Sequence, residues 1–507
     1  MSALLAFVLV CARVAEGLRA GPSAEYVVYP KLLEARGLNG VKLLHINEKL
    51  TLRLEKSSVL AENFVVSSLN GDKQVDNIVN GKEVEKNIYH DKSQMAVVSV
   101  TEKDGFVEVR GSLGHTLRIA PLPLMGRSED GHMAHRVFEI EDPAEFKTDY
   151  IEPTERKILA MPRIRTQVQI PDEFFVEVSF IFDEYHSKNF PDEESLLEYA
   201  ALSVQMVNLR YEATSRPKIT FVLVNVMTLT EGDSFTDTIE AADNLRPDRN
   251  KRYMLSRNTI NNLGNAIKTK RFKTKADLTV LITSLDLADY VNGELSNSVL
   301  GIAYLGGVCH VRMSVGQSED VPHTHSMVPI LTHELGHALG MVHDGETARY
   351  STPGNKDRVC DPKDGFTMAP VAHGQRQGQW SPCSLDQVRG FVSTLRKRCF
   401  DLLSPVQHRI NMTELPGAKL TKQRLCELTY PGFSDMSTEY ESKKAKECSV
   451  MCCPTELNGQ CLYAGFTDGM ECASGHHCVK HQCVKKERRP RPASPTTQSK
   501  RRKTART

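Results

Sequence analysis

Residues 333–343 are the part of the sequence that most constrains how this chain can fold. They read HELGHALGMVH. On a helix, His333 and His337 lie one turn apart on the same face, so both imidazoles can reach one zinc ion at about 2.0–2.1 Å. Gly340 permits a backbone turn that ends the helix and brings back His343 as a third ligand. Three protein ligands leave one position for water, which is the pattern of a catalytic zinc site.

Glu334 follows the first of these histidines and can lie over the metal without binding it. The alternative is a helix with histidines placed by chance, but the motif HExxHxxGxxH fixes five positions and leaves that alternative little weight. The motif resembles that of the metzincin peptidases. Asp344, directly after the third histidine, resembles the residue at this position in the reprolysin (adamalysin) branch, which includes the ADAM and ADAMTS proteases. The resemblance implies a zinc metalloendopeptidase with Glu334 as its catalytic residue.

The length of 507 residues predicts about two to four domains. The net charge of +1 gives no indication of a nucleic-acid partner. An apolar run at residues 3–11, followed by the small residues Ala15 and Gly17, predicts a signal peptide over residues 1–17, with a buried strand as the alternative. No later apolar run has the length of about 18 residues that a membrane-spanning helix needs.

The cysteines indicate the compartment. Of 13 cysteines, Cys11 lies in the leader, four lie between positions 309 and 399, and eight lie between 426 and 483. An even number, clustered late in the chain, predicts disulfides and secretion to the extracellular space. A cytosolic array of zinc ribbons is the alternative, but CxxC pairs with the required spacing are missing.

Residues 18–165 contain no cysteine and alternate apolar with polar residues, so we expect a β-rich region. Residues 114–122 and 135–138 resemble the end of a reprolysin prodomain, which implies a propeptide at 18–165. Many relatives carry a cysteine there that caps the zinc. Its absence excludes a cysteine switch, so latency must come from bulk occlusion or from another ligand. Basic residues at 156–157 and 163–165 predict processing, with a mature N-terminus near Thr166.

Residues 166–404 are expected to form the peptidase domain. Strands are predicted at 176–183, 219–226, 276–283 and 301–308, and helices at 194–211 and 258–272. This order resembles the upper subdomain of metzincins, an α/β (α+β) fold in which a twisted, mostly parallel sheet has helices on its faces. Residues 301–309, GIAYLGGVC, resemble the reprolysin edge strand, onto which an extended substrate adds as another strand.

The resemblance implies further positions. Residues 365–370 resemble the Met-turn, whose Met368 lies beneath the zinc ligands, although a lone methionine could also be core filler. Residues 380–384, WSPCS, resemble a segment typical of ADAMTS proteases. By resemblance we expect the disulfides Cys309–Cys399 and Cys360–Cys383.

A calcium ion is also implied by resemblance. Glu177 and Asp277 match two carboxylate positions of a reprolysin calcium site. The asparagine expected after the last catalytic cysteine is Leu402, for which Asp401 could substitute. Two ordinary strand carboxylates are the alternative, so calcium is possible beside zinc.

Residues 405–484 are expected to form a cysteine-rich unit, because their eight cysteines can support a domain with little core. Residues 468–484 resemble the end of a disintegrin-like module, which implies an exosite for protein substrates, matrix or cell surfaces; a plain spacer is the alternative. Asn411 begins a glycosylation sequon. The tail at 485–507 holds ten Lys or Arg against one Glu, which predicts a disordered segment able to bind glycosaminoglycans, or simply a solvated one.

Substrate identity is not encoded by these motifs. The layout resembles salivary metalloproteases of blood-feeding ticks, which implies fibrinogen, fibronectin and matrix proteins as substrates and an anti-haemostatic role. The alternative is a secreted protein that binds cells or matrix through its cysteine-rich domain while its peptidase domain is inactive.

Overall fold

The computed structural model describes residues 25–34, 42–70, 73–103, 106–140, 149–153, 170–230, 235–240, 252–355, 357–371, 376–404, 421–430, 433, 436–439, 448–457, 459–466, 469–479 and 482–486. The chain divides into two compact units, one of residues 1–34 with 42–410 and one of residues 35–41 with 411–507. The expected signal peptide, basic processing residues, sequon at Asn411 and tail beyond 486 lie outside the described residues. Among the described helices, none has the length and apolar character needed to cross a bilayer.

The first unit begins with a nine-stranded antiparallel sheet in the order β1-β11-β10-β9-β8-β7-β4-β3-β2. Its strands are β1 (Tyr26–Val28), β2 (Lys31–Glu34), β3 (Lys42–Asn47), β4 (Leu50–Lys56), β7 (Ile88–Asp91), β8 (Ala96–Lys103), β9 (Phe106–Leu113), β10 (Leu117–Pro121) and β11 (His135–Glu139). Alternation of apolar and polar residues places Leu52 and Leu54 of β4 in one buried cluster with Val98 and Val109.

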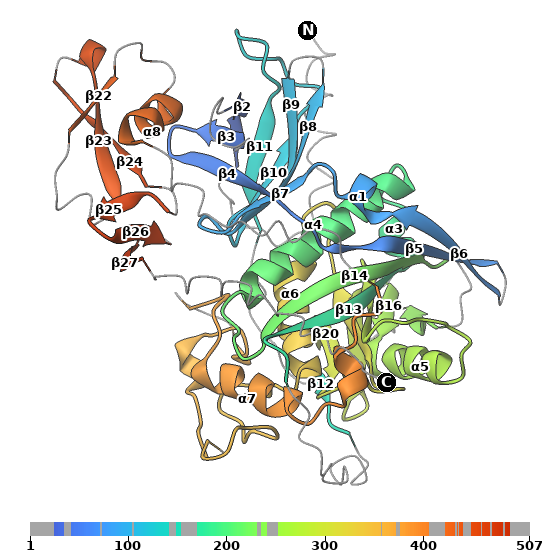
Figure 1. The fold of residues 1–507 in the computed structure, drawn as a ribbon. Coiled ribbons are helices and arrows are strands. Elements are labelled where there is room, and N and C mark those ends of the chain that lie inside the picture. Colours follow the sequence, from blue (N-terminus) through green and yellow to red (C-terminus); the bar gives the residue numbers. More distant parts are fainter. Residues whose placement is uncertain are drawn as a thin grey trace, which may run out of the picture. The chain divides into compact units, whose positions relative to one another are not determined.

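A second, eight-stranded sheet forms the centre of the same unit (Figure 1). In order, it contains β12 (Tyr150–Ile151), β20 (Gly301–Tyr304), β21 (Val315–Glu319), β17 (Leu278–Thr283), β13 (Glu173–Phe182), β14 (Lys218–Thr228), β5 (Leu60–Asn70) and β6 (Lys73–Asn80). The strands β21, β17, β13 and β14 are parallel, whereas β20 is antiparallel to β21, so the sheet is mixed. Continuous apolar runs such as LTVLIT in β17 suit strands that are buried on both faces.

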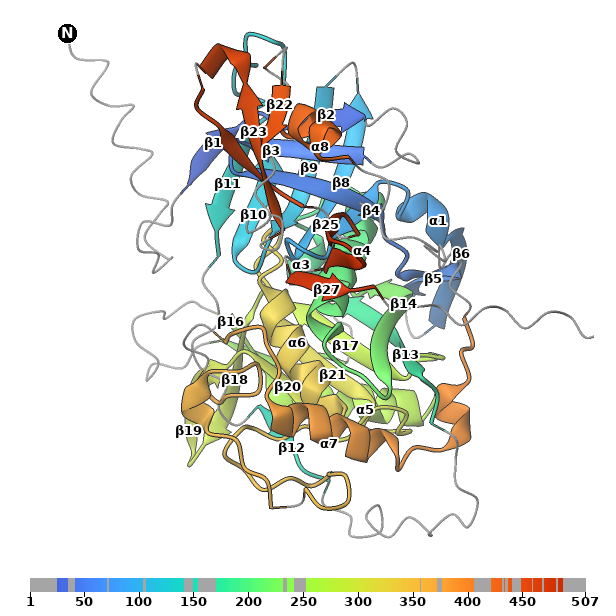
Figure 2. The ribbon, with the colours of Figure 1, turned by 60° about the vertical axis from the view of Figure 1, so that its left-hand side comes forward.

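Helices cover both faces of this sheet. Phe180 and Phe182 of β13 belong to the core cluster that contains the apolar side chains of α4 (Glu193–Tyr211) and α6 (Met327–Ala338), whereas Ile181 belongs to the cluster with α5 (Ser256–Lys268). Figure 2 shows α6 beside β20 and β21.

The remaining described elements of the unit are α1 (Gly81–Val84), α3 (Glu184–Ser187), α7 (Pro382–Val392), the 3₁₀ helices Pro362–Asp364 and Lys397–Phe400, and a small sheet of β15 (Thr238–Glu240), β16 (Arg252–Leu255), β18 (Asp286–Val291) and β19 (Glu294–Val299).

The N-terminal region supplies both edges of the central sheet. On one side β12 pairs in parallel with β20, and on the other β5 pairs in parallel with β14. Phe64 of β5 is fully buried in the core cluster of the peptidase sheet. The Asn225 side chain of β14 donates to the main-chain oxygen of Val65 (3.1 Å) and to Ser67 Oγ (2.8 Å). Strands that precede residue 166 in sequence are therefore built into the central sheet and its core.

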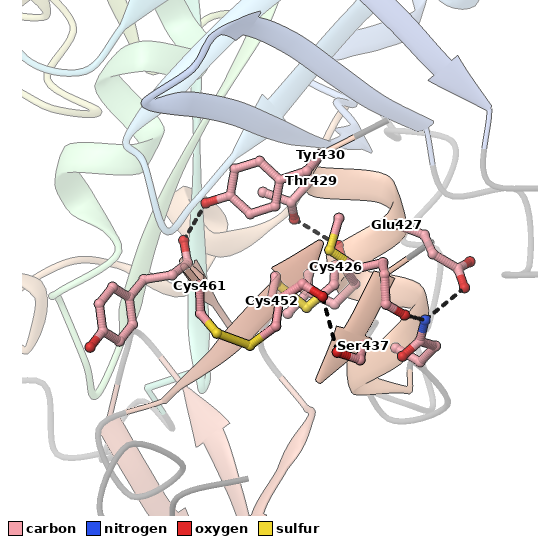
Figure 3. Close-up of a disulfide and its surroundings, with 12 residues drawn as sticks. Cys426, Glu427, Thr429, Tyr430, Ser437, Cys452 and Cys461 are labelled. Atoms are coloured by element: carbon pink, nitrogen blue, oxygen red, sulfur yellow. Dashed lines mark hydrogen bonds between the residues drawn. A yellow bond between two sulfur atoms is a disulfide. The ribbon is translucent and has the colours of Figure 1, made fainter. Parts of the chain in front are cut away.

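The second unit contains α8 (Lys422–Thr429) and two three-stranded sheets, formed by β22 (Met436–Glu439), β23 (Ser449–Pro454) and β24 (Leu462–Gly465), and by β25 (Glu471–Ala473), β26 (His476–Val479) and β27 (Gln482–Lys485); its 3₁₀ helix is Thr455–Leu457. Its disulfides are Cys426–Cys452, Cys448–Cys478, Cys453–Cys461 and Cys472–Cys483. In the surroundings of Cys461, the Tyr430 hydroxyl donates to the main-chain oxygen of Tyr463 at 2.6 Å (Figure 3). Five of the eleven buried residues in its core cluster are half-cystines, so the bridges stabilise this unit.

We predict that Phe64→Ala lowers the free energy of unfolding of the intact chain by about 3–5 kcal/mol, because it leaves a cavity in the core. The matched change Ile78→Ala, on the neighbouring strand β6, removes a side chain that is 71% exposed and should cost less than about 0.5 kcal/mol. Urea unfolding followed by the fluorescence of Trp380, the one tryptophan of the sequence, measures both. Equal stability of the two variants would show that β5 is not part of the peptidase core.

Candidate metal centre and active site

The start of helix α6 is fixed by a buried carboxylate. Asp320 Oδ1 accepts hydrogen bonds from the main-chain N–H of Met327 (2.9 Å) and from Ser326 Oγ (3.0 Å). Its second oxygen lies 2.7 Å from both the Tyr199 hydroxyl and His186 Nε2. These bonds satisfy main-chain donors at the helix N-terminus and place a negative charge at the positive end of the helix dipole.

Three histidines converge at the other end of α6. The Nε2 atoms of His333 and His337 are 3.0 Å apart, and those of His333 and His343 are 3.3 Å apart. Gly340 has a φ of +85°, and a Cβ there would meet Tyr350 at 2.7 Å and Phe391 at 2.8 Å, so glycine is required for the turn that returns His343.

The hydrogen bonds of the histidines direct their lone pairs at a common centre. His333 Nδ1 donates to the main-chain oxygen of Thr367 (2.7 Å) and His337 Nδ1 to that of Met341 (2.8 Å). With the Nδ1 atoms as donors, the neutral rings present Nε2 as acceptors, which cannot hydrogen-bond one another. Burial lowers the pKa of His337 to about 4, so it is neutral at physiological pH.

These distances fit a metal ion. Nitrogen ligands bound tetrahedrally at about 2.0–2.1 Å lie about 3.3 Å apart, close to the separations found here. Bonds from Nδ1 to backbone carbonyls are the usual outer-shell support of metal-binding histidines. His333, His337 and His343 therefore have the donor set and orientation for zinc.

An apolar floor and a polar brace support this centre. Met368 is fully buried, and a Cβ on Gly336 would lie only 2.7 Å from its sulfur. Asp344 donates its main-chain N–H to the oxygen of Met368 (2.8 Å) and accepts a hydrogen bond from Ser381 Oγ (2.6 Å). Ser381 also accepts from the N–H of Ser384 at the start of α7 (3.1 Å). The segment after the third histidine is thus joined to both the floor and the WSPCS segment.

Glu334 lies beside the metal centre with a carboxylate that is 2% exposed. Within the described residues, neither of its carboxylate oxygens has a hydrogen-bond partner. Its side chain packs over Gly301 of β20, where a Cβ would come within 2.8 Å of Oε1. Burial, reinforced by the charge of Asp149, raises the pKa of Glu334 well above its ordinary value. A carboxyl group with a high proton affinity next to a metal-bound position is suited to proton transfer.

The sequence analysis did not identify one residue of this centre, Asp149. Its Oδ2 lies 3.1 Å from His333 Nε2, and its Oδ1 lies 3.1 Å from His343 Nε2 and 3.4 Å from His337 Nε2. Burial alone would raise the pKa of Asp149, but His337 and His333 hold it well below its usual range. In the sequence, the missing prodomain cysteine was the one indication that another side chain could be a ligand. Several acidic residues between 129 and 152 were candidates for this ligand.

Glu177 and Asp277 also come together, away from the histidines. Asp277 Oδ2 accepts from the main-chain N–H of Glu177 (3.0 Å), and Glu177 Oε2 accepts from the N–H of Leu403 (3.1 Å). Glu177 Oε1 is buried without a partner in the described part of the chain. Burial, with a contribution from the charge of Glu177, raises the pKa of Asp277 to about 7. Leu403, rather than Asp401 or Leu402, supplies the contact from the end of the domain.

Two disulfides lie around the peptidase core. They join Cys309 to Cys399 and Cys360 to Cys383. The first lies beside the acidic pair, because Cys309 Sγ is 3.1 Å from Asp277 Oδ1. The second fixes the segment after the third histidine to helix α7, since Cys383 lies in that helix.

Comparison with known proteins identifies the class. Residues 211–394 match the model of "Metallo-peptidase family M12B Reprolysin-like". This match covers α6, the three histidines and Met368, which confirms the resemblance drawn from the motif. Residues 211–394 of this chain are therefore similar to the reprolysin family of zinc metallopeptidases.

Particular relatives agree with that class. The chain is 25% identical over 457 residues to "A disintegrin and metalloproteinase with thrombospondin motifs like" of Bombyx mori, covering 78% of this chain and 64% of that protein. It is 27% identical over 381 residues to "Venom metalloproteinase BumaMPs1" of Olivierus martensii, covering 72% and 90%. It is 29% identical over 223 residues to human "A disintegrin and metalloproteinase with thrombospondin motifs 20", covering 43% and 11%.

We predict that Gly336→Ala destabilises the chain by about 1–3 kcal/mol, because the new methyl group overlaps Met368 beneath the metal ligands. Helix propensity alone would favour alanine by about 1 kcal/mol, so the sign reports the contact. In a Met368→Ala background the overlap is removed, and the same change should become neutral or stabilising. A double-mutant cycle from unfolding curves checks this, and an equal cost in both backgrounds would contradict it.

Proposed function

We propose that this protein is a secreted zinc endopeptidase that is made as a latent proenzyme and hydrolyses peptide bonds in extracellular proteins. One observation carries the proposal: three buried imidazoles bring their Nε2 atoms to a common centre with Glu334 beside it. The residues of this centre are His333, His337 and His343 as zinc ligands and Glu334 as the catalytic group, with Gly340, Asp344 and Met368 in support.

The chain's own residues account for the chemistry. A zinc ion held by His333, His337 and His343 would supply a Lewis acid that polarises the substrate carbonyl and lowers the pKa of water to about 7. Glu334 accepts a proton from that water at a carboxylate oxygen and then donates it to the leaving amine. Gly301 leaves space for the carboxylate between α6 and the edge strand. The bonds from His333 and His337 to backbone oxygens keep both rings oriented during the reaction.

The substrate is proposed to be an extended polypeptide. Strand β20 borders the Glu334 side chain and is an edge strand of the peptidase sheet once β12 is removed. An extended segment added to this edge would obtain affinity from backbone hydrogen bonds and specificity from side-chain pockets. Relatives that are named as venom metalloproteinases support an endopeptidase, and fibrinogen, fibronectin and matrix proteins are the substrates to test for the proposed anti-haemostatic role.

In the processed enzyme, Glu334→Gln should retain zinc but lower kcat/KM by about 10²–10⁴, because the ligands are intact while the proton acceptor is lost. The matched variant His337→Ala should lose zinc and activity together. Metal analysis after dialysis and cleavage of a fluorogenic peptide measure both quantities. Undiminished turnover by Glu334→Gln would contradict the assigned role of the carboxylate.

The second unit is proposed to bind protein substrates, matrix or cell surfaces. It is a separate compact unit with four disulfides, which fits the oxidising environment outside the cell. A binding protein with an inactive peptidase domain remains the second function to test. If it is correct, the Glu334→Gln chain should keep every effect of the wild type on cells or plasma. If the endopeptidase is correct, those effects should disappear with turnover.

We also propose that Glu177 and Asp277 bind calcium, because a buried, partnerless oxygen of Glu177 lies beside a second carboxylate. Folding raises the pKa of Asp277 from its ordinary value of 3.8 to about 7, so without calcium the free energy of unfolding should fall as pH rises from about 4 to about 7.

Calcium should reverse this dependence by pairing with both carboxylates. At about 100 times its Kd it should stabilise the chain by about 2.7 kcal/mol, and by more at about pH 8 than at about pH 5. Thermal unfolding in zinc-containing buffer, with and without added calcium, measures the difference, and Asp277→Asn is the control that should remove it. A calcium effect that survives this substitution would place the ion elsewhere.

A further inference from the structure

We propose that Asp149 is the fourth ligand of the metal centre in the unprocessed chain, and that this carboxylate keeps the enzyme latent in place of a thiol. This inference rests on the proposed function. It concerns a residue that lies far from the zinc motif in sequence and that reaches the centre through the parallel pairing of β12 with β20.

The surroundings of Asp149 show what its carboxylate requires. The residue is 1% exposed, and neither carboxylate oxygen finds a hydrogen-bond donor in the described part of the chain other than the ring nitrogens around it. The Nε2 atoms of His333 and His337 cannot serve as donors while the Nδ1 atoms of these rings bond to carbonyls. A buried carboxylate that faces two such lone pairs is destabilised by repulsion, and a divalent cation between it and the imidazoles removes that repulsion.

The flanking backbone and side chains hold the carboxylate in place. The main-chain oxygens of Asp149 and Ile151 accept hydrogen bonds from Ala303 and Leu305, both at 3.1 Å. The segment therefore occupies the edge on which a substrate strand is proposed to add, and it places an acid side chain where the reacting carbonyl has to lie.

The residues after Asp149 add further contacts to the peptidase domain. The Tyr150 ring lies 4.6 Å from that of His337, and its hydroxyl donates to Glu346 Oε2 (2.7 Å). Arg349 Nη2 donates to both oxygens of Glu152, at 2.7 and 2.8 Å. The pairing with β20 and the bonds to Glu346 and Arg349 together explain how a short segment can keep a carboxylate at the metal centre.

The consequence for catalysis follows from ligand number. Four protein ligands make a closed site, whereas catalysis needs one position for water. With Asp149 bound, Glu334 has no water to deprotonate and the substrate edge is filled. Removal of the segment opens both together, without any change in redox state, because an oxygen ligand takes no part in thiol chemistry.

The test uses the intact, unprocessed chain loaded with cobalt(II), whose visible absorption depends on its ligands. Asp149→Ala should change that spectrum, release metal to a chelator about 10–100 times faster, and allow the intact chain to cleave a short peptide. Asp149→Asn, which keeps the shape but not the charge, should behave in the same way. Glu139→Gln is the matched control, since it removes a charge ten residues away whose carboxylate accepts a hydrogen bond from Thr116 Oγ1 (3.0 Å), and it should leave the spectrum unchanged.

Asp149→Cys separates a ligand from a space-filling residue. A thiolate should restore slow metal release and latency and add a sulfur-to-cobalt charge-transfer band. If Asp149→Ala and Asp149→Asn keep the wild-type spectrum and release rate while the processed enzyme binds cobalt and cleaves peptides, the Asp149 inference is wrong and the proposed function stands. If the processed enzyme binds no cobalt through its histidines, the proposed function itself fails.

Discussion

The main-chain oxygens of Thr367 and Met341 determine the chemistry of the metal centre, because each accepts the Nδ1 proton of one histidine. With both Nδ1 protons used in this way, the Nε2 lone pairs of His333 and His337 face each other at 3.0 Å in a buried site. Two acceptors this close repel each other, and a cation bound between them would relieve the repulsion. Gly340, Met368 and Asp344 all lie in or against the segment that brings these rings together, so the local fold after α6 is organised around the three histidines.

The motif was predictable because its information is local. Spacing on one helix, a glycine at a turn and a methionine after it specify His333, His337, His343 and Met368 without knowledge of the remaining fold. The end of strand β20 was less predictable. The strand was expected to continue to Val308, but it stops at Tyr304 because Gly306 has a φ of +67° and Gly307 N–H bonds back to the Tyr304 oxygen at 3.0 Å.

Long-range features could not be read from the sequence. Asp149 is one of many acidic residues in its region, and its role depends on a pairing between β12 and β20 that is set by distant packing. The insertion of β5 beside β14 has the same character, since an alternating strand can pair with either sheet. The eight C-terminal cysteines gave no basis for choosing their partners, which only the three-dimensional arrangement of the strands decides.

The placement of β5 and β6 beside β14 has a consequence for biosynthesis. Phe64 fills the same core as helices α4 and α6, so β5, which lies in the region proposed as the propeptide, belongs to the interior of the intact chain. Proteolytic removal of that region would then expose the hydrogen-bonding edge of β14 and open a gap where Phe64 was. The active form would then be reached only by processing of the folded, intact chain. It would be kept folded by kinetic barriers, because its structure would not be the free-energy minimum of the shortened chain. Refolding of the shortened chain would not regain it.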